Sequence, residues 1–241
     1  MPRTIPVPQI VSKHLDPESP AIRTLLKIDP AALENQSSRG KGDFSEGREL
    51  PKSITWRTRN VPLEDATISE ALADVHVAES KLAGTVASAK LSPKEKAVAY
   101  DDILVPSQDA VDAAKAAIDE LVAEGVPSAD KRLQALQVTR TALNYDLISW
   151  RIGRDRVLCG EDDGVTLETN NRKGKENTIG AKTAKLRERV VLYDSILQSL
   201  ESINELPGVA ADQTLGKELN SKRAYFSALR YLLHTINVFF G

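Results

Sequence analysis

Apolar residues in the last quarter of the chain recur at intervals of three and four, which is the spacing of one face of an α-helix. The first such series steps by four, three, four and three residues: Leu186, Val190, Tyr193, Leu197 and Leu200. A second series steps by three, four and three residues: Phe226, Leu229, Leu233 and Ile236. The break Leu206-Pro207-Gly208 separates them. The pattern predicts two helices whose apolar seams pack at a shallow angle against a neighbouring helix.

Three-to-four spacing also runs through the region after Pro62. A stripe is expected on one helix face from Leu72, Val75, Ala78, Leu82 and Val86. Ser92 and Glu95 form a capping-box pattern that opens the next helix, and Pro106 is expected to stop it. Ser107 would then cap a further helix that runs through Ala123.

Gly125 stands just past the expected end of that helix, where a left-handed residue is common. Ser128 would start another helix that runs to about Leu158. Its apolar positions keep close to heptad spacing: Leu133, Leu136, Leu143, Leu147 and Trp150. No strand-like alternation competes with these patterns, so the predicted fold class is all-α, built from antiparallel helical hairpins.

Two segments rich in glycine, serine and charge predict mobile loops, at residues 33–53 and 159–180. The expected organisation is therefore an irregular segment over 1–53, a helical-repeat region over 54–158, a charged flexible loop over 159–182 and a C-terminal hairpin over 183–241.

Charge is distributed unevenly although the net charge of the 241 residues is only −2. From Val61 to Asp130 there are 14 acidic residues and five lysines. From Lys131 to Gly160 six basic residues face two acidic ones, and from Asn170 to Arg189 seven face two. The chain is thus acidic in its middle and basic beyond it.

The residue pattern offers little for catalysis, so no enzyme activity, cofactor or metal is expected. The three histidines stand far apart, and neither a phosphate-binding loop nor a dinucleotide fingerprint occurs. The acidic pair Asp101-Asp102 and the run Glu161-Asp162-Asp163 are interpreted as solvated surface. A single cysteine, Cys159, fits a reducing compartment.

No apolar run approaches the ~20 residues that span a bilayer, and the first residues lack the apolar core of a signal peptide. The chain is therefore interpreted as cytosolic or nuclear, without membrane insertion.

Basic residues in the second loop and just after it are the main candidates for binding chemistry, because a run of positive charge can follow a phosphate backbone. They are Arg172, Lys173, Lys175, Lys182, Lys185, Arg187 and Arg189, and the alternative interpretation is a solvated loop and helix face. Arg57 and Arg59 are further candidates and follow Trp56, which could stack on a base or belong to the core. Arg151, Arg154 and Arg156 stand at the expected end of a helix, where their charges can neutralise exposed backbone carbonyls.

Three stretches of the sequence resemble one known protein family, in which they occur in the same order. They are ITWRTRNVPLEDATISEALADV, with its Trp-Arg-x-Arg-x-x-Pro run; LQALQVTRTALNYDLISWRIGRDRVLCG; and LRERVVLYDSILQSLESINELPGVAADQ followed by KELNSKRAYFSALR. The chain resembles the 68-kilodalton subunit of the eukaryotic signal recognition particle over most of residues 54–230, with fungal features. The family's main RNA-binding domain is expected upstream of the matched stretches, and the match is expected to end after Arg230, so the chain is interpreted as a middle portion.

The resemblance implies a non-catalytic subunit made of helical hairpins akin to tetratricopeptide repeats. Together with a 72-kilodalton partner it would bind the particle's RNA and help deliver translating ribosomes to the endoplasmic reticulum, with the particle's receptor as a further partner. Cytoplasmic location, a nucleolar assembly stage and peripheral association with that membrane are implied as well.

A protein-only adaptor is the alternative hypothesis. It would bind a partner helix, without any RNA contact, through an exposed seam over residues 215–236. The seam residues are Leu215, Leu219, Phe226, Leu229 and Leu233.

Overall fold

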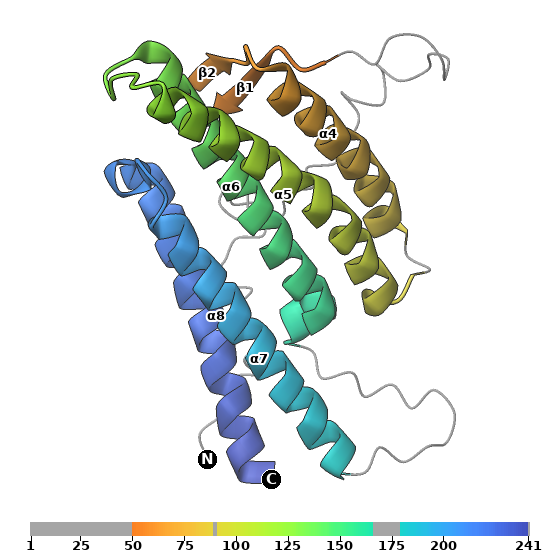
Figure 1. Cartoon of the computed structure of the whole chain (residues 1–241). Helices are drawn as coiled ribbons and strands as arrows, with labels where there is room; N and C mark the ends of the chain where they lie inside the picture. The colour runs from red at the N-terminus through yellow and green to blue at the C-terminus, as the bar shows by residue number, and fades with distance from the viewer. Residues whose placement is uncertain (1–49, 89–90, 166–178, 241) are drawn as a thin grey trace. The chain divides into compact units, whose positions relative to one another are not determined.

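The computed structural model describes residues 50–88, 91–165 and 179–240, all of which belong to one compact unit, Arg48–Gly241. Five long helices and one two-stranded hairpin make up this described part (Figure 1). The all-α prediction is confirmed for the class as a whole, and the small sheet is an addition to it.

The hairpin pairs β1 (Ser53–Trp56) with β2 (Arg59–Pro62) in antiparallel register, so that Ile54 lies opposite Val61. Both of these side chains are buried, and they belong to the same hydrophobic core as the buried residues of the three helices that follow. The helical-repeat region predicted over 54–158 thus opens with a hairpin, and its first helix begins after Pro62, where the helical pattern of the sequence also starts. Each strand holds only four residues, too few for an alternation to be recognised.

The first helical pair consists of α4 (Ala66–Ala87) and α5 (Pro93–Ala123). Asp65 caps α4 by accepting a hydrogen bond from the Ile68 amide at 3.0 Å. The predicted stripe faces the core, with three members buried and two half-buried: Leu72, Val75, Leu82, Ala78 and Val86. The predicted capping box at the start of α5 is also confirmed.

Pro106 does not stop α5, and the prediction of a separate helix beginning at Ser107 is wrong. A proline inside a helix removes one backbone hydrogen bond and typically costs about 3 kcal/mol. Here the helix continues because residues on both sides of Pro106 are buried against α4 and α6: Ile103, Ser107, Ala110 and Val111. Tertiary packing therefore overrides the local signal.

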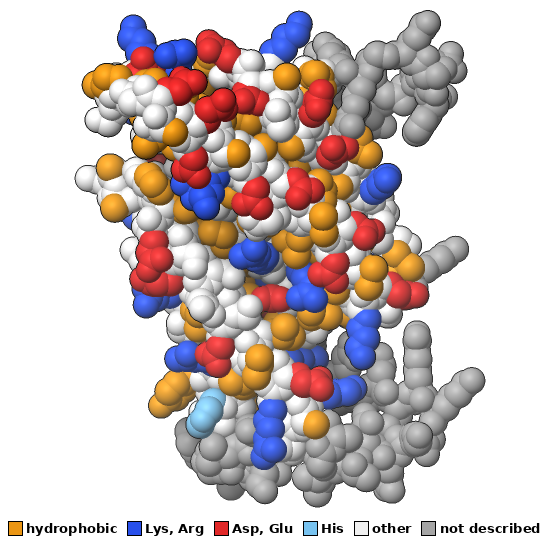
Figure 2. All heavy atoms as spheres, in the orientation of Figure 1, with side chains coloured by type: hydrophobic (Ala, Val, Ile, Leu, Met, Phe, Trp, Pro, Cys, Tyr) orange, Lys and Arg blue, Asp and Glu red, His pale blue; other side chains and the backbone are white. Residues whose placement is uncertain are grey.

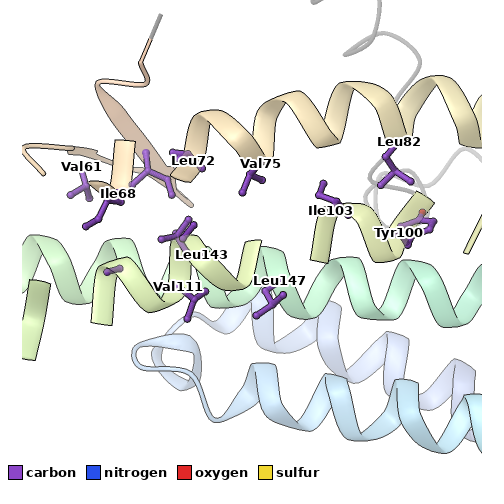
Figure 3. Close-up of a cluster of buried hydrophobic side chains, with 14 residues drawn as sticks. Val61, Ile68, Leu72, Val75, Leu82, Tyr100, Ile103, Val111, Leu143 and Leu147 are labelled. Carbon is purple, nitrogen blue, oxygen red and sulfur yellow. The ribbon is translucent and has the colours of Figure 1, made fainter. Parts of the chain in front are cut away.

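Helix α6 (Lys131–Cys159) begins after Asp130, two residues later than predicted, because the Asp130 side chain accepts a hydrogen bond from the Arg132 amide. It packs against α5, and Gly153 allows a close approach there. A Cβ added to Gly153 would lie 2.7 Å from the Tyr100 ring. Figure 3 shows the core that results, in which side chains of α4 point toward Leu143 and Leu147 of α6.

The second helical pair consists of α7 (Ile179–Asn204) and α8 (Gln213–Phe240), joined through the short turn Val209–Ala211. Helix α6 contacts α7, and α7 contacts α8 (Figure 1). The predicted break is confirmed, and Gly208 adopts a left-handed φ of 81°. A second core lies along these helices, and its largest fully buried side chains are Tyr193, Phe226, Ile196, Leu200, Leu215 and Leu219.

The predicted seams of α7 and α8 thus pack on each other. Whether the helices form tetratricopeptide-like repeats stays a prediction.

Candidate nucleic-acid interface

The predicted basic run is covered only in part. Arg172, Lys173 and Lys175 lie outside the described residues, as does the side chain of Lys182. Lys185 and Arg187 are exposed near the start of α7. Of this run, these are the two described side chains that remain open to an external phosphate.

Arg189 differs from them because its guanidinium has a partner inside the chain. It donates a hydrogen bond to the Gly164 carbonyl at 2.9 Å and is half-buried. Gly164 has a left-handed φ of 79°, and a Cβ added there would lie 2.7 Å from the Cys159 carbonyl oxygen and 3.1 Å from Nε of Arg189. Arg189 therefore holds the turn after α6 in place.

Hydrogen bonds from α6, α7 and α8 hold that turn, residues 160–165, in place. Asp163 is buried and accepts two hydrogen bonds from Arg156, at 2.8 Å from Nε and 3.0 Å from Nη2. Its Oδ2 also accepts a hydrogen bond from the Tyr225 hydroxyl at 3.1 Å, and its carbonyl accepts one from Tyr193. These contacts join α6, α7 and α8. We call this set the helix junction.

Burial and the charge of Asp163 together shift the pKa values at and beside the junction. Burial alone would lower the pKa of Arg156, but the hydrogen bonds and charge of Asp163 outweigh it and leave that pKa raised. Burial, assisted by the charges of Asp163 and Asp155, raises the pKa of Cys159 to about 12. Cys159 is thus a neutral buried thiol at pH 7, which disfavours nucleophilic chemistry.

The sequence interpretation of this region is wrong in two respects. Residues 159–165 are ordered as the end of α6 and a short 3-10 turn, in place of the expected flexible loop. Asp163 and Arg156 form a buried pair, in place of the expected solvated carboxylate and helix-end charge, whereas Glu161 and Asp162 of the same run are exposed as expected. The one available signal was the pair of glycines, Gly160 and Gly164, which bracket the acidic run and favour a left-handed turn.

Arg57 also has partners inside the chain. It occupies the hairpin turn with a φ of 56°, and its Nε lies 2.9 Å from Oδ2 of Asp212, with Glu218 at 3.8 Å. Asp212 accepts a hydrogen bond from the Leu215 amide at the start of α8. The hydrogen bond from Leu215 is the largest cause of a lowered pKa of Asp212, and the hydrogen bond and charge of Arg57 lower this pKa further. Arg57 thus ties the hairpin to α8.

Arg59 is exposed and lines an open groove of about 490 Å³ between the hairpin, α6 and the turn before α8. Half-buried Trp56 lies in the same groove and packs edge-on to Tyr145, with ring centroids 5.2 Å apart. Trp56 thus has a core contact and one side toward the groove. The groove offers polar groups beside Arg59, from Gln134 and Gln137.

The proposed partner seam is not exposed. Leu215, Leu219, Phe226, Leu229 and Leu233 are 0–6% exposed, since α7 covers them. The prediction that these residues form an exposed binding site for a helix of another protein is wrong.

Within the described ranges, no group of three or more His, Cys, Asp or Glu residues is placed to hold a metal ion. Across the same ranges, no helix has the length and apolarity needed to cross a membrane.

The family model described as RNA-binding signal recognition particle 68 matches residues 1–236. The chain belongs to this family. The match covers more than the three quoted stretches, since it reaches residue 1 on one side and passes Arg230 on the other. The expectation that resemblance is confined to residues 54–230 is therefore wrong.

Two curated relatives carry the same name. The signal recognition particle subunit srp68 of Schizosaccharomyces pombe is 27% identical over 191 residues, which cover 79% of this chain and 27% of that protein. The subunit SRP68 of Saccharomyces cerevisiae is 24% identical over 185 residues, covering 76% of this chain and 27% of that protein. The chain thus spans about a quarter of the length of these relatives. No solved structure matches it.

Proposed function

We propose that this chain is a non-catalytic scaffold of the signal recognition particle that contacts the particle's RNA through exposed basic side chains. The observation that carries the proposal is the match of an RNA-binding particle family to residues 1–236. The described structure supports a scaffold, because helical packing and a buried polar junction fix the helices relative to one another.

Phosphate contacts by flexible exposed cations supply most of the sequence-independent affinity of proteins for nucleic acid. Lys185 and Arg187 meet that requirement at the start of α7, and Arg59 meets it on the hairpin. Arg172, Lys173, Lys175 and Lys182 extend the same basic run and are included in the proposal. Arg57 and Arg189 act in it by holding the hairpin and the junction in place.

Further parts of the proposal concern the whole particle. The 72-kilodalton subunit and the particle's receptor are the proposed protein partners, and cotranslational targeting to the endoplasmic reticulum is the proposed process. The proposed location is the cytoplasm, with assembly in the nucleolus and peripheral association with the reticulum membrane. The names of both relatives as subunits of this particle support these assignments.

The test is equilibrium binding of the chain to fluorescent signal recognition particle RNA over a series of salt concentrations. The double variant Lys185→Glu and Arg187→Glu should bind more weakly, and the slope of log affinity against log salt should fall by about 1 for each phosphate that the variant no longer neutralises. Both residues are exposed and neither has a hydrogen bond or ion pair with another described residue, so stability should change by less than about 0.5 kcal/mol.

The matched control is Lys94→Glu with Lys115→Glu, which reverses two exposed charges on α5. This control should keep the RNA affinity and salt slope of the wild type. Equal slopes for all three proteins would remove Lys185 and Arg187 from the interface. No binding by the wild type at low salt would refute the proposal for this chain.

A further inference from the structure

A second groove, of about 380 Å³, runs between α4 and α5. One stripe from each helix lines it, with three- and four-residue spacing along each. The α4 stripe is Asp74, Val77, Ala78, Lys81 and Thr85, and the α5 stripe is Asp102, Val105, Pro106 and Asp109.

Part of the lining of this groove is apolar and exposed to solvent. Val105 is 64% exposed and Val77 is 48% exposed, although both belong to helices whose other faces are buried. Val98 lies one turn before Asp102 on the same side of α5 and is 59% exposed. Three large aliphatic side chains in water along one surface are a feature of interaction sites.

The rim is negatively charged, with three aspartates and one lysine lining the groove. Asp102 and Asp109 are exposed, and neither has a hydrogen bond or ion pair among the described residues. Figure 2 shows acidic side chains interleaved with apolar surface over the region of α4 and α5. A surface of this sign repels the phosphates of RNA.

Pro106 adds a second acceptor at the same place. Since proline has no amide hydrogen, the backbone carbonyl of Asp102, four residues earlier, lacks its usual helical donor. The carboxylate and this carbonyl belong to the same residue, in the α5 wall of the groove. A lysine or arginine carries the several donors that could satisfy both, and hydrogen bonds to a charged donor are the stronger kind.

We propose that the groove between α4 and α5 docks an amphipathic helix of another protein, with aliphatic side chains on Val77 and Val105 and Lys or Arg side chains at Asp102 and Asp109. An amphipathic helix in an apolar groove is a common mode of peptide recognition. The charge of the rim selects a basic helix, and the surface is separate from the cations assigned to RNA.

The probe is a synthetic helical peptide with leucines on one face and flanking lysines, and its counterpart has glutamates in place of the lysines. Binding to the full chain is measured by fluorescence anisotropy. The wild type should bind the lysine peptide saturably. Asp102→Lys with Asp109→Lys should weaken that binding about tenfold and should create binding of the glutamate peptide.

The control variant is Asp119→Lys with Glu120→Lys, which makes the same charge change at exposed sites of α5 beyond the groove. It should bind both peptides as the wild type does. A paramagnetic label on the lysine peptide gives a readout that needs no variant, since it should broaden the amide signals of residues 74–85 and 98–109 in the wild type.

Three results would overturn the proposal: absence of saturable binding by the wild type, an equal loss in the control variant, or broadening centred outside these two stretches.

Discussion

The helix junction predicts that Asp163→Asn destabilises the fold strongly, although the side chain keeps its size and shape, because the substitution removes the charge and replaces one acceptor oxygen with a donor NH2 group. Asn fits the left-handed φ of 53° at this position about as well as Asp does, so the backbone is not strained further. Arg156 keeps its charge but loses a carboxylate partner at 2.8 Å in a site where the two side chains are 19% and 10% exposed. Breaking one partner of a buried pair typically costs about 3–5 kcal/mol.

Asp162→Asn is the matched control. Asp162 has a φ of 49° in the same turn, but its side chain is exposed and makes no hydrogen bond or ion pair within the described part of the chain. The same chemical change there should alter the free energy of unfolding by less than about 0.5 kcal/mol. The free energy of unfolding of both variants is measured by urea titration at pH 7, with the helical circular dichroism signal as the readout.

A double-mutant cycle separates the ion pair from other effects. Arg156→Met removes the buried charge, so adding Asp163→Asn to it should cost less than Asp163→Asn costs alone, by about 0.5–3 kcal/mol of coupling. A loss for Asp163→Asn no larger than that for Asp162→Asn, together with zero coupling, would refute the idea that this pair fixes the three helices.

Three further predictions test other parts of the fold. Phe226→Ala should lower the free energy of unfolding by about 3–5 kcal/mol because the ring is fully buried, whereas Tyr231→Ala, at 76% exposure, should have little effect in the same urea titration. Pro106→Ala should raise the melting temperature, because alanine restores a helical hydrogen bond worth up to about 3 kcal/mol relative to proline, and an unchanged or lower value would count against this. Burial raises the pKa of Asp155 despite its hydrogen bond from Ser195, so ionisation of Asp155 weakens the folded state as pH rises through that pKa. Asp155→Asn should therefore be more stable than the wild type at pH 7, and its advantage should shrink as pH falls below that pKa; an advantage that grows in acid would contradict the sign.

Long amphipathic helices were predictable because their periodicity extends over many turns. The stripe through Leu72, Val75 and Leu82 and the seams of α7 and α8 all reach the core as expected. The seams did not reveal which helix they pack against, since periodicity shows that a helix face is buried but not which element covers it. The partner is the other helix of the hairpin, and this removed the basis for a protein-only adaptor acting through Phe226.

Local rules failed where distant residues decide the structure. Pro106 has the appearance of a helix stop, but burial of its neighbours carries α5 through it. Asp163 belongs to a run that resembles solvated surface, yet its partners come from three helices and as far along the chain as Tyr225. Arg57 and Arg189 could not be distinguished from free cations by sequence, because Asp212 and Gly164 contact them only in the fold.

We propose that the chain is part of an RNA-associated subunit of the signal recognition particle. The most direct measurement is purification, from its own cells, of the tagged protein that contains this sequence, followed by sequencing of the RNA that copurifies. The account predicts strong enrichment of signal recognition particle RNA, reduced when Lys185 and Arg187 are both replaced by glutamate. Recovery of protein partners with no enrichment of that RNA would contradict it.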